Sequence, residues 1–393
     1  MFTASLPAVP YSDPWKIPLS VRLKMMARGR RRIAYYYEEA NNSTFRYRAY
    51  NMAQVLNDVK NNDVSAGYFF QADLHQIEDI VDLADVLVIC RSMYNHHINE
   101  LIMKFHVRGK RVLFDIDDLV FDVRYAHLVI NTLDQDVDNP AVWHDWFAWI
   151  GRLGETLRGC DGAITTNSNL AARIAEFSGL PVYVVPNFIN KEQLELSERL
   201  YAEKKASGFA SDGKIHLGYF SGSPSHDLDF EMIVPALENL LDDDPRLELV
   251  ITGYIEQHPL LKRFGKRVIQ QPFHDYINLQ RLVGSVEYNL VPLQSNVFTS
   301  CKSELKYFEA AVAGTISIAS PTHTYAKAIR HGHNGYLSRA HQWASVIRQA
   351  IGQMDSYQEM ASTAFADART KYVGLNQREV ILKALGMSQS EGA

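Results

Sequence analysis

Two lysines and a glutamate in the C-terminal third are spaced to act together on an anionic ligand. Lys302, Lys306 and Glu309 stand at positions i, i+4 and i+7, so a helix would place them on one face. We expect Ser303 as the N-cap of this helix and Gly314 as its left-handed stop. Ammonium groups near a helix N-terminus suit a diphosphate, because the exposed N–H groups there also favour anions. A carboxylate one turn further suits the hydroxyls of a ribose. The alternative is a surface helix with hydrated charges.

A glycine- and serine-rich loop, GYFSGSPS at residues 218–225, supports the first interpretation. It follows a predicted strand and precedes a predicted helix. Gly222 would let backbone N–H groups approach a phosphate, and the hydroxyls of Ser221 and Ser223 would add donors. The loop does not have the GxGxxG spacing of dinucleotide sites, so we expect no such cofactor.

Three acids follow a buried strand in the first half of the chain. Asp115, Asp117 and Asp118 end the segment 112–118, VLFDIDD, where parallel strands deliver residues to a cleft. Asp115-x-Asp117 is also the spacing of a divalent-metal pair. A third interpretation is an acidic turn that caps a helix.

Further candidates belong to the side of an acceptor substrate. Arg91 ends the predicted strand before YNHH and would meet an anion there, and His97 would supply a base near neutrality. Arg46 and Arg48 lie at the start of a predicted helix, and either would contact an acceptor or a donor phosphate. A helix at 142–157 carries Trp143, Trp146, Phe147 and Trp149, which suit sugar stacking, a membrane interface or core packing.

Two blocks of alternating strands and helices must position these residues. Continuous apolar strands separated by helices predict parallel sheets covered on both faces, so each block is expected to be a doubly wound α/β domain. In the first block the expected strands are 33–37, 67–70, 86–90, 111–116, 163–166 and 182–185, and the expected helices are 45–56, 74–83, 98–107, 142–157 and 170–177. In the second block the expected strands are 215–220, 247–252, 267–271, 286–290, 316–319 and 335–337, and the expected helices are 229–241, 276–283, 303–313, 325–329 and 342–354.

The segment KSELKYFEAAVAGTISIAS, residues 302–320, resembles the donor-binding segment of GT-B glycosyltransferases, close to the retaining family 4 enzymes of bacterial polysaccharide and glycan assembly. Other pieces are similar to that family in the same order, and together they span most of residues 32–355. These pieces are VPNFI at 185–189, GYFSGS at 218–223, VPL at 291–293 and HNGYL at 333–337.

The resemblance implies a role for particular residues. Glu309 matches the second glutamate of the family's E-x7-E motif, which holds the ribose, and Lys302 and Lys306 would serve the diphosphate. Cys301 stands where the first glutamate is expected, which puts the usual carboxylate contact to the donor sugar in doubt. Glu304 could replace that glutamate only if the turn is rearranged. Asp118 matches the aspartate of the family's "HD" segment, and Asp117 stands in place of its histidine.

The resemblance also implies a domain plan, a GT-B fold of two Rossmann-like doubly wound domains that face each other across a cleft. We expect a basic N-terminal tail (1–31), an N-terminal acceptor domain (32–190), a linker (191–212), a nucleotide-sugar-binding domain (213–372) and a C-terminal helix crossing back to the first domain (373–393).

Composition limits the classes of binding partner and the cellular compartment that we expect. A net charge of −5 gives no reason to expect nucleic-acid binding, and three scattered cysteines fit a reducing cytoplasm. No apolar stretch is long enough for a transmembrane helix. Six arginines and lysines within residues 22–32 suggest peripheral contact with an anionic membrane at its inner face, or a solvated basic tail.

Together these features predict a glycosyltransferase that moves a sugar from a nucleoside-diphosphate sugar to a glycan or lipid-linked hydroxyl, with retention and without a metal or other cofactor. Asp117 is the expected catalytic residue, followed by Asp118 and His97. A base on the opposite face would instead give inversion. The rivals are a catalytically inactive GT-B subunit that binds a nucleotide sugar or scaffolds an assembly complex, and a GT-B epimerase.

Overall fold

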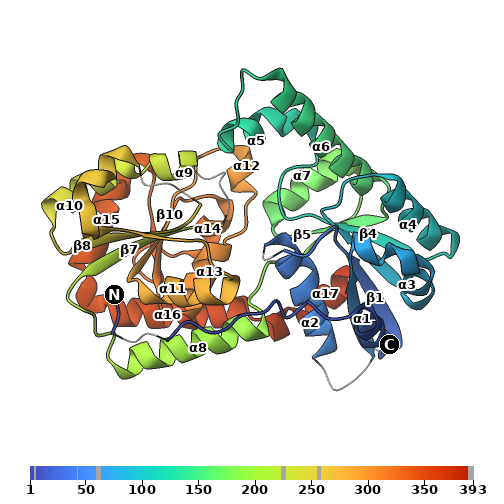
Figure 1. Cartoon of the computed structure of the whole chain (residues 1–393), viewed down its shortest axis with the longest axis horizontal. Helices are drawn as coiled ribbons and strands as arrows, with labels where there is room; N and C mark the ends of the chain where they lie inside the picture. The colour runs from blue at the N-terminus through green and yellow to red at the C-terminus, as the bar shows by residue number, and fades with distance from the viewer. Residues whose placement is uncertain (4–5, 42, 59–62, 223–226, 255–257, 388–393) are drawn as a thin grey trace.

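The computed structural model describes residues 1–393 except 4–5, 42, 59–62, 223–226, 255–257 and 388–393. The chain forms two α/β domains side by side, each built on a sheet with helices on both faces (Figure 1). Each expected strand overlaps an observed one, because a strand buried on both faces is a continuous apolar run that stands out in the sequence.

The N-terminal sheet has six strands in the order β2-β1-β3-β4-β5-β6, and every described pairing in it is parallel. Its strands are β1 (Arg31–Tyr36), β2 (Val64–Phe69), β3 (Val86–Cys90), β4 (Arg111–Asp115), β5 (Gly162–Thr165) and β6 (Val182–Val184). Its covering helices are α2 (Asn51–Asn57), α3 (Ile77–Leu83), α4 (His96–Val107), α5 (Ala126–Thr132), α6 (Pro140–Arg158) and α7 (Ser168–Ser178). A π-helical turn, η1 (Arg46–Tyr50), begins the helix expected at 45–56.

The C-terminal sheet repeats this plan in the order β12-β11-β10-β7-β8-β9, again with parallel pairings. Its strands are β7 (Ile215–Ser221), β8 (Leu247–Gly253), β9 (Val268–Gln271), β10 (Tyr288–Val291), β11 (Ile316–Ala319) and β12 (Tyr336–Leu337). Its helices are α9 (Asp227–Glu231), α10 (Val234–Asp243), α11 (Tyr276–Ser285), α12 (Val297–Ser300), α13 (Leu305–Val312), α14 (His323–Ala328), α15 (Trp343–Gly352) and α16 (Tyr357–Lys371).

The expected linker is mostly one helix, α8 (Lys191–Ala206), and it packs on the C-terminal domain. Its buried Lys204 donates to the carbonyl oxygens of Ala313 (2.7 Å) and Gly314 (3.2 Å) at the end of α13. Gly314 has a φ of +68°, the left-handed stop expected for this helix. The linker helix and α13 are therefore fixed to each other.

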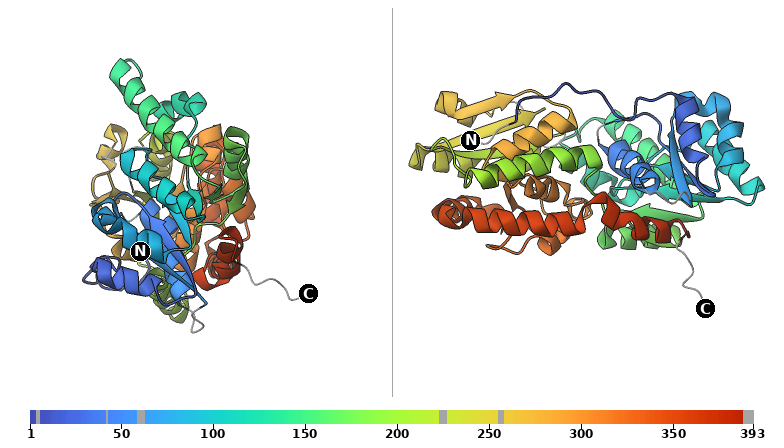
Figure 2. Two further views of the ribbon diagram at one scale, coloured as in Figure 1. Left: turned by 90° about the vertical axis from the view of Figure 1, so that its right-hand side faces the viewer. Right: turned by 90° about the horizontal axis from the view of Figure 1, so that it is seen from below.

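The two chain ends tie the domains together. Residues 6–18, before α1 (Leu19–Met26), run along both domains in Figure 2, and Phe2 lies in the core of the C-terminal domain and Trp15 in that of the N-terminal domain. Helix α17 (Arg378–Ala384) packs on the N-terminal domain, and its Ile381 and Leu382 join the same core as Trp15.

The expected free basic tail is therefore wrong in part. Arg22 is buried and donates to both carboxylate oxygens of Asp73, at 2.5 and 2.9 Å. Lys24, Arg28 and Arg30 are exposed. The part of the chain that the structure describes contains no helix long and apolar enough to cross a membrane.

Strand order fixes where a ligand can enter. The order reverses between β1 and β3 in the first sheet and between β10 and β7 in the second. Ligands of doubly wound domains bind beyond the carboxyl ends of the strands at such a switch point. The loops after these four strands meet at one cavity between the domains.

Candidate active site

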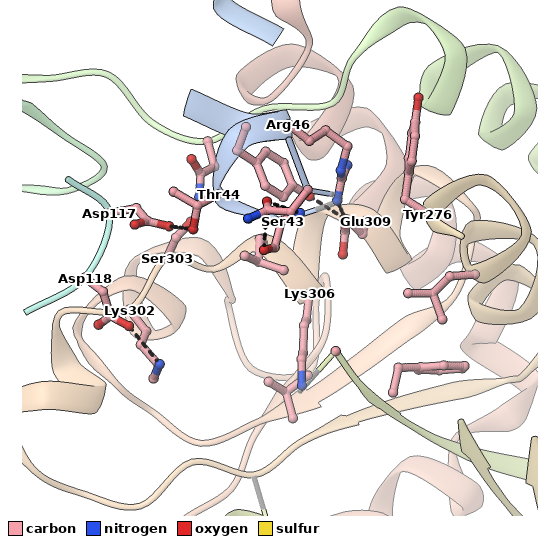
Figure 3. A pocket seen from close by; sticks show the side chains of 18 of the residues that line it. Ser43, Thr44, Arg46, Asp117, Asp118, Tyr276, Lys302, Ser303, Lys306 and Glu309 are labelled. Carbon is pink, nitrogen blue, oxygen red and sulfur yellow. Dashed lines mark hydrogen bonds and ion pairs between the residues drawn. The ribbon is translucent and has the colours of Figure 1, made fainter. Parts of the chain in front are cut away.

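A cavity of about 780 Å³ lies between the two domains and receives both switch points. From the N-terminal domain it is lined by the loop after β1, by Arg91 after β3 and by Asp117 and Asp118 after β4. From the C-terminal domain it is lined by Phe220 and Gly222 at the end of β7, and by Lys302, Lys306 and Glu309. Figure 3 shows Asp117 and Asp118 of one domain and Lys302, Lys306 and Glu309 of the other around one space. The structure thus brings most of the sequence-predicted residues together.

The helix carrying the donor candidates is shorter than expected. α13 begins at Leu305, and its N-cap is Glu304 rather than Ser303. Lys302 therefore lies in the preceding turn, outside the helix, while Ser303 lines the cavity. The two ammonium groups still reach the same cavity, but the shared helix face extends only from Lys306 to Glu309.

Lys306 is the cation best suited to a ligand. Its ammonium group lies 5.3 Å from the centre of the Tyr219 ring, and none of the described residues forms a hydrogen bond or ion pair with it. Burial lowers the pKa of Lys306 to about 8, although Asp229 and Glu309 oppose the shift. A bound phosphate would supply the missing counter-charge.

Glu309 is held by the protein through one carboxylate oxygen. Its Oε1 accepts hydrogen bonds from the hydroxyl of Tyr47 and from Nε2 of Gln193 (3.0 Å), and Nη2 of Arg46 lies 3.4 Å away. Gln280 donates to the backbone carbonyl of Glu309 (2.6 Å). The carboxylate lines the cavity in one fixed orientation.

Cys301 and Glu304 do not supply the missing carboxylate. Cys301 is fully buried in the apolar core of the N-terminal domain, and Asn167 and Asn169 of the α7 end bond to its carbonyl oxygen and thiol. Burial raises the pKa of its thiol to about 12, so it stays neutral. Glu304 accepts a hydrogen bond from Tyr372 (2.7 Å) and does not line the cavity.

The glycine loop is described only in part. Gly222 is exposed and lines the cavity, and a Cβ built on it would meet open space. Ser221 is the last residue of β7, with a buried side chain that does not line the cavity. Ser223 and Ser225 lie outside the described residues. Phosphate contacts from this loop therefore stay a prediction, carried by Gly222.

Asp115 is held in the fold and does not share the cavity with Asp117. Arg48 donates to both of its carboxylate oxygens, at 2.7 and 2.9 Å, and both side chains are fully buried. Arg48 also donates to the carbonyl oxygen of Val185 and to Asn187. A metal pair of Asp115 and Asp117 is thus unsupported by the geometry. No cluster of three or more metal-ligating acids, histidines or cysteines occurs among the described residues.

Asp117 and Asp118 face the cavity, each paired with a cation. Asp117 accepts hydrogen bonds from Arg91 (3.1 Å) and Thr44 (3.2 Å). Asp118 lies 3.2 Å from the ammonium group of Lys302 across the domain boundary, and its other oxygen accepts the backbone N–H of Leu119. The two acids therefore have different partners.

Arg91 has a strained backbone, with a φ of +38°. For a residue other than glycine this conformation costs on the order of 1–3 kcal/mol and is typical of functional sites. Its guanidinium lies 5.6 Å from the ring centre of Trp149 and also donates to Thr44 (3.1 Å). The strain delivers the guanidinium to the cavity.

Two predicted residues stand elsewhere than expected. His97 is exposed in the first turn of α4 and does not line the cavity. Asn95 is the N-cap of that helix, and its side chain accepts the backbone N–H of Ile98. Arg46 lines the cavity beside Glu309, whereas Arg48 is bound to Asp115 and does not line it.

Sequence reasoning missed several lining residues. Thr44 and Tyr47 lie at the start of the helix that the sequence predicts, and helical spacing alone does not indicate that their hydroxyls reach the acids of the cavity. Trp146 and Trp149 of α6 line the cavity, with their rings perpendicular at 5.2 Å, together with the apolar Leu133. Their aromatic cluster was noticeable in the sequence, but core packing explained it equally well.

No known protein family matches the sequence. No curated protein matches it either.

Similar solved structures do exist. HepE from Anabaena, crystallised with UDP and glucose and with UDP-glucose, has a TM-score of 0.60 in the first complex, with 14% identity over 90% of this chain and 99% of that chain. Sucrose-phosphate synthase from Thermosynechococcus elongatus has a TM-score of 0.59, with 14% identity over 90% and 97% of the two chains. A trehalose-6-phosphate synthase studied for glycosyl transfer with retention has a TM-score of 0.59, with 10% identity over 91% and 99%. With its two parallel sheets facing one cavity, the chain has the GT-B fold.

Proposed function

We propose that this protein is a glycosyltransferase that moves a sugar from a nucleoside-diphosphate sugar to an acceptor hydroxyl. The observation that carries the proposal is the single cavity in which Lys306 and Glu309 of one domain face Asp117 and Arg91 of the other. This arrangement suits a reaction between a diphosphate-linked donor and a second substrate. The GT-B fold and the HepE complexes with UDP and UDP-glucose support it.

The donor half of the cavity has the groups that transfer requires. When the bond between the anomeric carbon and the diphosphate breaks, negative charge develops on the leaving oxygen. Lys306 and the backbone at Gly222 would stabilise that charge, and Lys302 would join them on leaving Asp118. Glu309 would hold the ribose. These residues can do this without a metal, so metal independence stays part of the proposal.

The part of the cavity proposed for the acceptor contains the carboxylate of Asp117 and the aromatic side chains of Trp146 and Trp149. With retention, the acceptor oxygen attacks from the face that the diphosphate leaves, and its proton passes to the departing phosphate oxygen. Asp117, fixed by Thr44 and Arg91, would orient the acceptor hydroxyl. Trp146 and Trp149 would contact the acceptor, a glycan or a lipid-linked sugar.

The direct test is turnover with a panel of nucleotide sugars. We expect the purified protein to hydrolyse at least one of UDP-, GDP-, dTDP- or ADP-sugars slowly, and faster with a matching acceptor. NMR of the product would report the α or β configuration of the new bond and so distinguish retention from inversion. Absence of both binding and turnover across the panel would refute the proposal.

A second candidate function rests on Cys301. A GT-B subunit that binds a nucleotide sugar or scaffolds a complex needs no carboxylate at that position, and the buried neutral thiol supplies none. Nucleotide binding without turnover, unchanged in Asp117→Ala, would favour this candidate. Formation of an epimerised nucleotide sugar would instead indicate an epimerase.

We further propose that the protein works in the cytoplasm, at the inner face of a membrane. Within residues 22–32, exposed Lys24, Arg28 and Arg30 would contact anionic lipid. Each contributes about 1 kcal/mol near such a surface.

A further inference from the structure

Three parts of the chain meet at the carboxylate of Glu309. Tyr47 and Arg46 come from η1 in the N-terminal domain, Gln193 from α8, and Glu309 from α13 in the C-terminal domain. The Tyr47 hydroxyl and the Gln193 amide both donate to Oε1. Arg46 binds Gln193 (2.9 Å) as well as approaching Oε1, so the donors are linked to one another.

The other carboxylate oxygen, Oε2, receives no hydrogen bond from any of the described residues, although Glu309 lines the cavity. An ionised carboxylate has about four acceptor positions, so unused acceptor capacity remains for a ligand. Burial raises the pKa of Tyr47 well above its usual value, so its hydroxyl stays protonated and donates a hydrogen bond to Glu309. The protein therefore binds Oε1 of Glu309 and leaves Oε2 available to a ligand.

The segment from Thr44 to Arg48 also holds Asp117 and the strand that ends just before it. Arg48 binds Asp115 at the end of β4. Thr44, which lies just before the turn, donates to Asp117, two residues after Asp115 in the chain. Successive residues of η1 thus contact the donor-side carboxylate and the strand that delivers Asp117. π-Helical turns are rare and are frequent at functional sites.

We propose that Tyr47 is a positioning residue that fixes Glu309 so that Oε2 meets the ribose hydroxyls of the donor nucleotide. Recognition of the ribose is then complete only when the N-terminal domain contacts the C-terminal domain through this turn. The inference rests on the proposed function, in which Glu309 binds the ribose.

The test measures discrimination between riboses. The affinity of the full-length protein for UDP or GDP, whichever binds more tightly, is compared by titration calorimetry with that for the 2′,3′-dideoxy analogue, which lacks both hydroxyls. We expect the wild type to prefer the ribonucleotide by about tenfold or more, because hydrogen bonds to a charged group are lost in the analogue. In Tyr47→Phe we expect this preference to fall to about a third of its value or less.

Tyr50→Phe is the matched control. Tyr50 lies in the same turn, and its hydroxyl donates to Glu192 of α8 (2.8 Å), away from the cavity lining. This variant should keep the wild-type preference. If Tyr47→Phe does not fold, Arg46→Lys removes a second neighbour of Oε1 and should lower the preference in the same direction.

The outcomes separate the inference from the proposed function. An unchanged preference in Tyr47→Phe, or equal weakening of both nucleotides, would overturn the positioning role. A preference that survives Glu309→Ala, or no nucleotide binding by the wild type, would instead refute the ribose site on which the inference rests.

Discussion

The lowered pKa of Lys306 makes nucleotide binding depend on pH in a defined direction. Only the ammonium form can neutralise a diphosphate. With a pKa of about 8, the group is about 90% protonated at pH 7 and about 10% protonated at pH 9. A bound diphosphate favours the charged form and raises this pKa, so binding above pH 8 must take up a proton.

The expected magnitude follows from these fractions. Between pH 7 and pH 9 the affinity for a nucleoside diphosphate should fall about tenfold, or about 1.4 kcal/mol, if the pKa of Lys306 in the complex lies well above about 10. The range lies above the second ionisation of a terminal phosphate, near 6, so the charge of the diphosphate changes little across it. Asp229, Glu309 and Lys302 are the charged groups that act on Lys306 most strongly.

Titration calorimetry in two buffers of different ionisation enthalpy measures both affinity and proton uptake. We expect about 0.9 proton taken up per nucleotide at pH 9 and about 0.1 at pH 7. Lys306→Arg should make binding nearly independent of pH, because a guanidinium stays charged. A wild-type affinity that does not change with pH, or the same slope in Lys306→Arg, would refute the role of Lys306.

Three further predictions concern catalysis, stability and membrane contact. Asp117→Asn should leave nucleotide affinity within about twofold but lower sugar transfer by about 10²-fold in steady-state assays, because the acceptor hydroxyl loses its orientation; equal turnover would contradict its role. Arg48→Met should lower the free energy of unfolding by about 3–5 kcal/mol in urea titration, because it leaves a buried carboxylate unpaired; a change below 1 kcal/mol would contradict this. Replacing Lys24, Arg28 and Arg30 by alanine should abolish co-sedimentation with anionic vesicles at low salt, whereas neutral vesicles should bind neither protein; undiminished binding would exclude this surface.

Local sequence determined the fold class. The apolar strands predict two parallel sheets, and segment 302–320 with its glycine stop indicates a helix that presents cations and an acid. These features are readable because burial on both faces and helix capping depend on neighbouring residues. The β3 strand has the bounds expected, 86–90, and β11 has those expected at 316–319.

Sequence could not fix where α13 begins or how the N-terminal basic segment packs. The start of α13 moved from Ser303 to Leu305, since a capping residue competes with tertiary contacts around the turn. The burial of Arg22 with Asp73 depends on a residue 51 positions away, and an arginine in a basic run gives no sign of such a partner.

The active site was likewise only partly encoded in local patterns. The sequence nominated Lys306, Glu309 and Asp117, because charges at strand and helix ends can be recognised one element at a time. Only the tertiary structure decided that Asp115 forms an ion pair with Arg48 and that the hydroxyl of Tyr47 donates to Glu309 from the other domain. Hydrogen bonds between residues 262 positions apart arise from the packing of two domains, which no spacing in the chain records.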